Sequence, residues 1–254
     1  MMNRKYLDDL ARIVTKAGVL LLENGAEVYR VEETMYRLCE YFGCSTIDSY
    51  ATPSLIMISF TLDGELSHNI KRIKERRINL EKVDMVNDLS RKTVSEKLSL
   101  DELGKGLNEI EERKPYPVSY ILFGSFISCG GFALAFGGGI REIISASLIS
   151  LVVRVMIIFM SRMNINDFFR DLFGAFTLTA IGMIVGRMGL ANGDLVIGST
   201  IMLLVPGLAI TNAIRDSING DTNSSMIRFM EAVFVAIAIG LGSGIAYFFI
   251  RSIL

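Results

Sequence analysis

Histidine and cysteine are scarce in this chain, which limits the metal and redox chemistry that it can carry out. Among 254 residues there is one histidine, His68, and there are three cysteines, Cys39, Cys44 and Cys129, without a CxxC pair. An odd number of cysteines with no histidine at ligand spacing favours reduced, buried thiols over a zinc site or a disulfide framework. We therefore expect no metal site and no other cofactor.

An excess of one charge, a nucleotide-binding loop and a secretion signal are also missing. The formal net charge is -1, which argues against nucleic acid as a partner. No Gly-Lys-Ser/Thr phosphate loop occurs, so ATP-driven pumping by this chain is excluded. An amphipathic stretch follows Met1–Lys5 in place of the apolar core of a signal peptide, so we expect a cytoplasmic N-terminus.

What the chain does contain is divided unevenly along its length. Residues 1–117 hold 18 Lys and Arg and 20 Asp and Glu, whereas residues 118–254 hold 8 and 7. No lysine follows Lys114, and 17 of the 23 glycines lie in the second part, as is common in membrane helices. The sequence thus predicts a cytoplasmic domain over residues 1–115 and a transmembrane domain over residues 116–254.

The first part alternates between helical and strand patterns. Apolar residues at helical spacing predict helices over residues 7–21 and 26–42, and again from Leu80 and from Ser99. Strands are predicted near residues 46–50, 55–60 and 66–74, with Asp63-Gly64 as a turn. We expect a small α+β domain of three antiparallel strands with helices on one side. The basic run Lys71–Arg77 either contacts anionic lipid headgroups or is a solvated strand end.

Five apolar runs in the second part are each close to the ~20 residues of a membrane-spanning helix. They lie at about residues 116–136, 143–160, 172–188, 195–214 and 229–250. The fold class is therefore an α-helical integral membrane protein with five transmembrane helices and an N-terminal cytoplasmic α+β domain. More arginines and lysines flank the cytoplasmic ends than the outer ends, which agrees with the positive-inside rule and puts the C-terminus outside. The pairs Gly182/Gly186 and Gly240/Gly244 favour close helix packing.

Arg154 places a charge inside the second predicted span. A charge at that depth costs about 2.5–3.5 kcal/mol on insertion scales, so it needs a partner or a wet cavity. The candidate partners are Asp171, Asp216 and Glu231, all near helix ends. The alternative is that the side chain extends to the cytoplasmic interface.

Pro206-Gly207 interrupts the fourth predicted span near its middle. Since proline has no N–H, it cannot donate to the Met202 carbonyl, and the sequence predicts a broken helix. A half-helix that begins within the membrane can hold a substrate carboxylate; the alternative is a kink before an ordinary helix end. A polar stripe follows the break at i,i+4 spacing, made by Thr211, Asn212, Arg215 and Asp216.

These residues belong to a longer pattern that resembles a known family. The order Pro206-Gly207, Thr211-Asn212-Ala213-Ile214-Arg215-Asp216, Gly220-Asp221, Arg228 and Glu231-Ala232 resembles the signature of the threonine/serine exporter (ThrE) family. Asn219 directly precedes Gly220 in the same stretch and is also a candidate transport residue. The run Leu22–Glu32, with Gly25, Glu27, Arg30 and Glu32, resembles the amino-terminal signature of that family, and Ile78–Val83 fits as well. Two distant motifs match in order, so the resemblance covers nearly the whole chain.

The resemblance implies a secondary transporter that exports small carboxylates or amino acids, threonine/serine or succinate-like, across the cytoplasmic membrane. Fused members are similar to exporters driven by the proton motive force and have roughly double the membrane helices. This chain is similar to the larger component of the split, two-chain (YjjP-like) form, which implies a small integral-membrane partner. We expect the motif residues from Pro206 to Glu231 and Arg154 to serve transport, and Gly25, Glu27, Arg30 and Glu32 to form the N-terminal motif.

Two functions of other classes are alternatives to transport. One is a membrane-anchored sensor or regulatory protein whose N-terminal domain binds a ligand. The other is an enzyme with Glu27, Arg30, Glu32 and Glu33 as an acid–base cluster, but Glu27–Arg30 and Glu33–Arg37 have the spacing of surface helix pairs. No nucleophile and base occur together, so we expect no enzymatic activity. A homo-oligomer is the alternative to a partner subunit.

Overall fold

The computed structural model describes residues 4–74 and 76–253. Their contacts divide the chain into two units. Unit 1 comprises Met1–Lys114 and Leu208–Phe229, and unit 2 comprises Pro115–Gly207 and Met230–Leu254. The segment Leu208–Phe229, which follows the predicted break at Pro206-Gly207, is thus part of the same unit as the amino-terminal region.

Unit 1 contains a three-stranded antiparallel sheet in the order β1-β2-β3, which confirms the predicted strand arrangement. The strands are β1 (Ser45–Thr52), β2 (Leu55–Leu62) and β3 (Glu65–Arg72). The Asp63-Gly64 turn joins β2 to β3, and both residues have positive φ, as a two-residue hairpin requires. β3 ends at Arg72, two residues before the predicted end, although Ile73 still donates its N–H to the Ser54 carbonyl at 2.9 Å.

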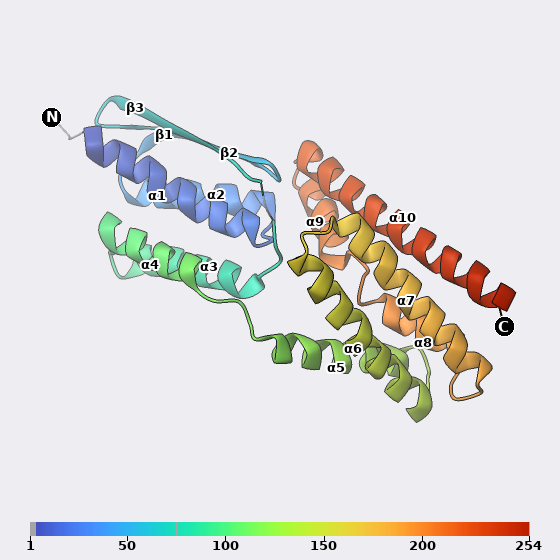
Figure 1. The fold of residues 1–254 in the computed structure, drawn as a ribbon. Coiled ribbons are helices and arrows are strands. Elements are labelled where there is room, and N and C mark those ends of the chain that lie inside the picture. Colours follow the sequence, from blue (N-terminus) through green and yellow to red (C-terminus); the bar gives the residue numbers. More distant parts are fainter. Residues whose placement is uncertain (1–3, 75, 254) are drawn as a thin grey trace. The chain divides into compact units, whose positions relative to one another are not determined.

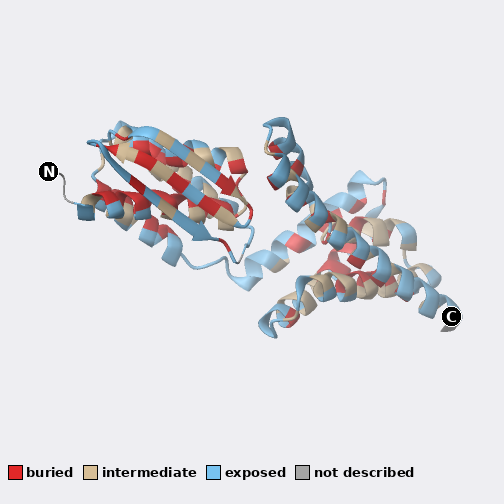
Figure 2. Ribbon diagram, turned by 90° about the horizontal axis from the view of Figure 1, so that it is seen from above, coloured by how far each residue is buried: buried red, intermediate tan, exposed pale blue. Residues whose placement is uncertain are grey.

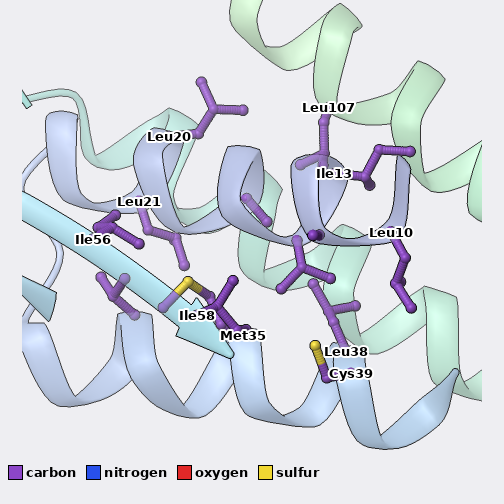
Figure 3. Packing of buried hydrophobic residues seen from close by; sticks show 14 of the residues in the cluster. Leu10, Ile13, Leu20, Leu21, Met35, Leu38, Cys39, Ile56, Ile58 and Leu107 are labelled. Atoms are coloured by element: carbon purple, nitrogen blue, oxygen red, sulfur yellow. The ribbon is translucent and has the colours of Figure 1, made fainter. Parts of the chain in front are cut away.

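Helices cover one face of the sheet in two layers (Figure 1). α1 (Arg4–Glu23) and α2 (Val28–Tyr41) pack on the strands, and α3 (Leu80–Ser95) and α4 (Leu100–Glu112) pack on the other side of α1 and α2. α1 is therefore buried on most of its circumference. Figure 3 shows the resulting core, in which Leu21, Met35 and Ile58 meet from α1, α2 and β2. Full burial of such a side chain contributes about 1.5–3 kcal/mol.

The basic run at the end of β3 is exposed. The side chains of Lys71, Arg72, Lys74, Arg76 and Arg77 are all exposed, and Glu75 lies outside the described residues. Exposure agrees with a solvated strand end and with contact to lipid headgroups, so both interpretations of the run stay open.

Unit 2 is helical. It contains α5 (Val118–Ala135), α6 (Ile140–Arg162), α7 (Asp167–Arg187), α8 (Gly193–Ile201) and the larger part of α10 (Thr222–Ile253). Within the described residues, α5, α6, α7 and α10 are the four helices long and apolar enough to cross a membrane. Many of their large apolar side chains are exposed, among them Phe123, Phe159 and Phe248. Figure 2 colours much of the ribbon of this unit as exposed. Such surfaces suit a lipid environment.

The fourth predicted span is not a continuous helix. α8 ends at Ile201, and α9 (Gly207–Ile218) begins directly after Pro206, so the break expected at this proline is present. The exact count of five spanning helices is therefore not reproduced. α7 and α10 also begin earlier than predicted, at Asp167 and Thr222, because a search for apolar runs passes over the polar first turns of helices.

Glycines mark the closest helix approaches in unit 2. A methyl group added at Gly186 would lie 3.0 Å from the Gly193 Cα atom, so α7 packs tightly on α8, as the Gly182/Gly186 pair predicts. On α10 the predicted pair makes no close contact in the part of the chain that the structure describes, where Gly240 and Gly244 have nothing within 4 Å of an added methyl group. Gly242 makes the close contact instead, with the backbone of Leu172 and Phe176 on α7.

Candidate functional site

Three separate segments of unit 1 meet at the N-terminus of α2. The Asn79 N–H donates to the Asn24 carbonyl at 3.1 Å, and the Arg77 N–H donates to the Glu23 carbonyl at 2.7 Å. The Asn212 side-chain amide, from α9, donates to the Gly25 carbonyl at 3.0 Å. Apart from Arg77, these residues lie in stretches that the sequence singled out as motifs: 22–32, 78–83 and the part of the carboxyl-terminal motif that belongs to unit 1, 208–229.

The turn between α1 and α2 has a backbone shape that requires glycine. Gly25 has φ +100°, in the left-handed region that other residues adopt only with strain. A methyl group at this position would also lie 3.3 Å from Leu208 Cδ2. The turn is therefore shaped to receive the beginning of α9.

A buried ion pair joins α9 and α10 at this turn. Arg228 Nε lies 3.0 Å from Asp216 Oδ2, with side chains 8% and 0% exposed. Asp216 Oδ1 accepts the Val28 N–H at 3.3 Å, and the Arg228 guanidinium donates to the Ala26 carbonyl at 2.8 Å. Asp216 thus caps the first turn of α2, where the helix dipole favours a negative charge.

A second set of charges surrounds the buried pair. Glu27 is the N-cap residue of α2 but makes no side-chain capping bond. Instead it pairs with Arg215 from α9 and, at 3.5 Å, with Arg30. Both arginine side chains are about half exposed, at 53% and 51%. Pairs so open to solvent stabilise weakly, so Arg215 can exchange its partner more readily than Arg228 can.

Three carboxyl groups of the cluster have raised pKa values. Burial raises the pKa of Glu32, and the charges of Asp221 and Asp216 raise it further, whereas the hydrogen bond that its carboxylate accepts from the Ala51 N–H at 2.7 Å opposes the shift. Burial also raises the pKa of Asp221 and that of Asp216, where the Arg228 charge opposes the shift. A raised carboxyl pKa means that stability is gained as the pH falls through it. Within the described residues, no group of acidic, histidine or cysteine side chains could hold a metal ion.

The other predicted transport residues are spread over the two units. Thr211 and Gly207 are exposed and Pro206 is half-buried. Asn219, Gly220 and Asp221 directly follow the end of α9 at Ile218. Gly220 has φ +89°, as a residue just past a helix often does. Glu231 belongs to unit 2.

Arg154 has a different partner from the one expected. Its Nε donates to the Ser125 hydroxyl on α5 at 2.9 Å, and no salt bridge joins it to Asp171, Asp216, Glu231 or another described carboxylate. A search by charge alone could not find a hydroxyl partner.

Sequence reasoning also missed how the two signatures fit together. It treated Glu27–Arg30 as a surface helix pair and Asp216 as part of a membrane stripe. Asp216 instead accepts a hydrogen bond from the backbone N–H of Val28. The backbone carbonyls of Gly25 and Ala26 are also acceptors here, and backbone acceptors cannot be recognised from the pattern of side chains. The one available signal was that both motifs combine charged residues with a glycine turn.

Gly25→Ala should weaken the docking of α9 on the turn. Left-handed backbone strain of about 1–3 kcal/mol adds to crowding against Leu208. Gly64→Ala is the matched control, since Gly64 has φ +81° but nothing within 4 Å. Hydrogen exchange of residues 208–218 in the purified protein should rise in the Gly25 variant and not in the Gly64 variant. Equal exchange in both would show that the contact with Leu208 is unimportant.

The comparisons with known proteins agree with the motifs. The family model described as "Putative threonine/serine exporter" (ThrE) matches residues 12–250. "Probable succinate transporter subunit YjjP" of Klebsiella aerogenes is 23% identical over 235 residues, which cover 92% of this chain and 91% of that protein. The Escherichia coli protein of the same name is 22% identical over the same shares of both chains. "Probable threonine/serine exporter" of Mycobacterium tuberculosis is 20% identical over 94% of this chain but 45% of its own length.

No solved structure matches the chain. The family model covers nearly all of the sequence, including both ends of the buried ion pair. This chain belongs to the threonine/serine exporter (ThrE) family.

Proposed function

We propose that this chain is the larger subunit of a secondary transporter that exports small carboxylates or amino acids, threonine/serine or succinate-like, across the cytoplasmic membrane. A small integral-membrane protein would be the second subunit. The lengths of the relatives support this division. The chain covers 91% of proteins named as transporter subunits but 45% of the mycobacterial exporter, so a second chain can supply the remaining part.

The broken segment between α7 and α9 is the observation that carries the proposal. With a cytoplasmic N-terminus, α5, α6 and α7 would cross outward, inward and outward. We propose that residues 188–206 then return to the cytoplasmic side, which the assignment of Leu208–Phe229 to unit 1 supports. The nine residues of α8 rise about 14 Å, less than half of the ~30 Å hydrocarbon core. Part of the return must therefore be non-helical, as residues 202–206 are.

Non-helical backbone at membrane depth is tolerated only against protein or in a water-filled cavity. This is typical of the discontinuous helices of transporters and is not required of a simple anchor. After the return, α10 crosses outward, so we propose an extracytoplasmic C-terminus. Arg215, on α9 in unit 1, has a half-exposed side chain and an exchangeable partner, and a substrate carboxylate can replace Glu27 there.

The test is counterflow transport in proteoliposomes. The chain would be reconstituted alone, with a co-expressed small membrane protein of the same family, and that protein would be reconstituted alone. We expect uptake of labelled threonine, serine or succinate only with both chains present. Arg215→Lys should lose most of this transport, because lysine cannot bind a carboxylate bidentately; Arg251→Lys, at the end of α10, is the control. Full transport by the single chain would favour a homo-oligomer, and no transport by the pair would contradict the proposal.

A further inference from the structure

A small, polar seam runs between α5 and α6 in unit 2 and ends at Arg154. Ser125, Cys129 and Gly130 on α5 face Ser147 and Ser150 on α6, and all five are buried. Arg154 is half-buried beside them, eight residues before the end of α6 at Arg162, which is about 12 Å along the helix. Its Nε donates to the Ser125 hydroxyl at 2.9 Å.

Each hydroxyl group of the seam donates a hydrogen bond to a backbone carbonyl. Ser125 donates to Ile121 at 2.9 Å, Ser147 to Phe126 at 2.9 Å, and Ser150 to Ser147 at 2.6 Å. None of these groups supplies a negative charge. Within the part of the chain that the structure describes, no carboxylate pairs with Arg154, so nothing there neutralises its charge.

Arg154 differs in this respect from the other basic residues of the spanning helices. Arg141, Arg162, Arg187 and Arg251 lie at helix ends. Arg170 is in the first turn of α7 and pairs with Asp167, and Arg228 pairs with Asp216 in unit 1. Arg154 is thus the described cation that lies well inside a span, where an unneutralised charge is least favourable.

The geometry of the Arg154 guanidinium indicates which kind of group can pair with its two terminal amino groups. Ser125 fixes the Nε side, which leaves the edge formed by the two terminal amino groups for another partner. That planar edge matches a carboxylate bidentately. The names of the relatives refer to succinate, threonine and serine, and each of these molecules carries a carboxylate.

We propose that Arg154, oriented by Ser125, binds the carboxylate of the transported substrate within unit 2. This site rests on the proposed transport function and deepens it, because it is separate from the α9 cluster and lies within a spanning helix. Together with Arg215, Arg154 would make a carboxylate necessary in a substrate. Ser125 is a positioning residue, which holds the guanidinium in the binding orientation.

The experiment compares carboxylate substrates with their amide analogues in the reconstituted two-chain transporter. Succinate and threonine would be measured beside succinamide and threoninamide, for the natural chain and for Arg154→Gln, Arg154→Lys and Ser125→Ala. Arg162→Gln, on the same helix but exposed at its end, is the matched control. We expect Arg154→Gln to raise KM for the carboxylates about 10–100-fold, as for loss of a charged hydrogen bond, and to reduce the preference for carboxylate over amide by a similar factor.

The graded variants separate binding from folding. Arg154→Lys keeps the charge without the planar edge, so it should have an intermediate KM, and Ser125→Ala should raise KM less than Arg154→Gln does. A normal KM in a well-expressed Arg154→Gln protein would overturn the inference. A second outcome would also overturn it: Arg154→Gln no longer co-purifies with the partner subunit but still prefers carboxylates to amides. That result would mean that Arg154 pairs with an acidic residue of the partner and not with the substrate. If the natural pair transports none of these compounds, the proposed function fails and this site with it; if the natural pair transports and Arg154→Gln transports equally well, only the site fails.

Discussion

Arg228→Met should destabilise unit 1 by about 3–5 kcal/mol, because it leaves the Asp216 carboxylate buried without its counter-charge. Asp216 is fully buried, and its one further hydrogen bond given by the structure comes from the Val28 N–H. Removal of the arginine also leaves the Ala26 carbonyl without its donor. The loosened region should be the turn before α2, so hydrogen exchange of residues 24–32 in the purified protein is the local readout, with thermal unfolding as the global one.

Two further variants distinguish a buried charge from general damage. Asp216→Asn combined with Arg228→Met removes both charges and retains an acceptor for Val28, so the double variant should be more stable than Arg228→Met alone. Arg215→Met is the matched control on the same cluster, because Arg215 is 53% exposed in its pair with Glu27 and should cost at most about 1 kcal/mol. If Arg228→Met and Arg215→Met were equally mild, the buried pair would not hold the turn.

Gly242→Ala should separate α10 from α7 and leave little folded protein in detergent. The added methyl group would overlap the Leu172 carbonyl oxygen and would lie 3.0 Å from the Phe176 nitrogen. Backbone atoms within a helix cannot move aside as a flexible side chain can, so the whole helix must shift. Overpacking of this kind costs about 1–3 kcal/mol or more.

The same helix provides the controls. Gly240→Ala and Gly244→Ala add the same group where nothing lies within 4 Å, so both should fold as well as the natural chain. The measurement is the yield of monodisperse protein and its thermal midpoint, for the three variants side by side. A destabilised Gly240 variant beside an unaffected Gly242 variant would reverse the assignment of the packing face.

Local features of the fold could be predicted from the sequence because they depend on neighbouring residues. The hairpin at Asp63-Gly64, the helical period of α1 and the break at Pro206 each follow from the backbone preferences of a few adjacent side chains. The glycine pattern on α10 shows the limit of such reasoning. It gives two possible faces, Gly240/Gly244 and Gly242, and the choice depends on the position of the α7 backbone.

The candidate site was harder to predict for a related reason. Its residues could be named from the motifs, but the contact between Asp216 and Val28 joins positions 188 residues apart, and its acceptor and donor groups are partly backbone. Arg154 likewise needed a partner, and the search for one considered carboxylates only. Ser125 pairs with it because α5 lies against α6, which no local pattern encodes.

The distance along the chain between Val28 and its cap also matters while the protein is being made. The turn before α2 leaves the ribosome long before Asp216 and Arg228 exist, since 188 residues separate the first two. At a synthesis rate of about 5–20 residues per second, the interval is roughly 10–40 s. During that time the Val28 N–H at the start of α2 lacks the Asp216 carboxylate that accepts it in the folded protein, and three membrane helices must be inserted. The amino-terminal domain is therefore completed last although it is synthesised first, and a chain interrupted before residue 216 lacks the carboxylate that caps it.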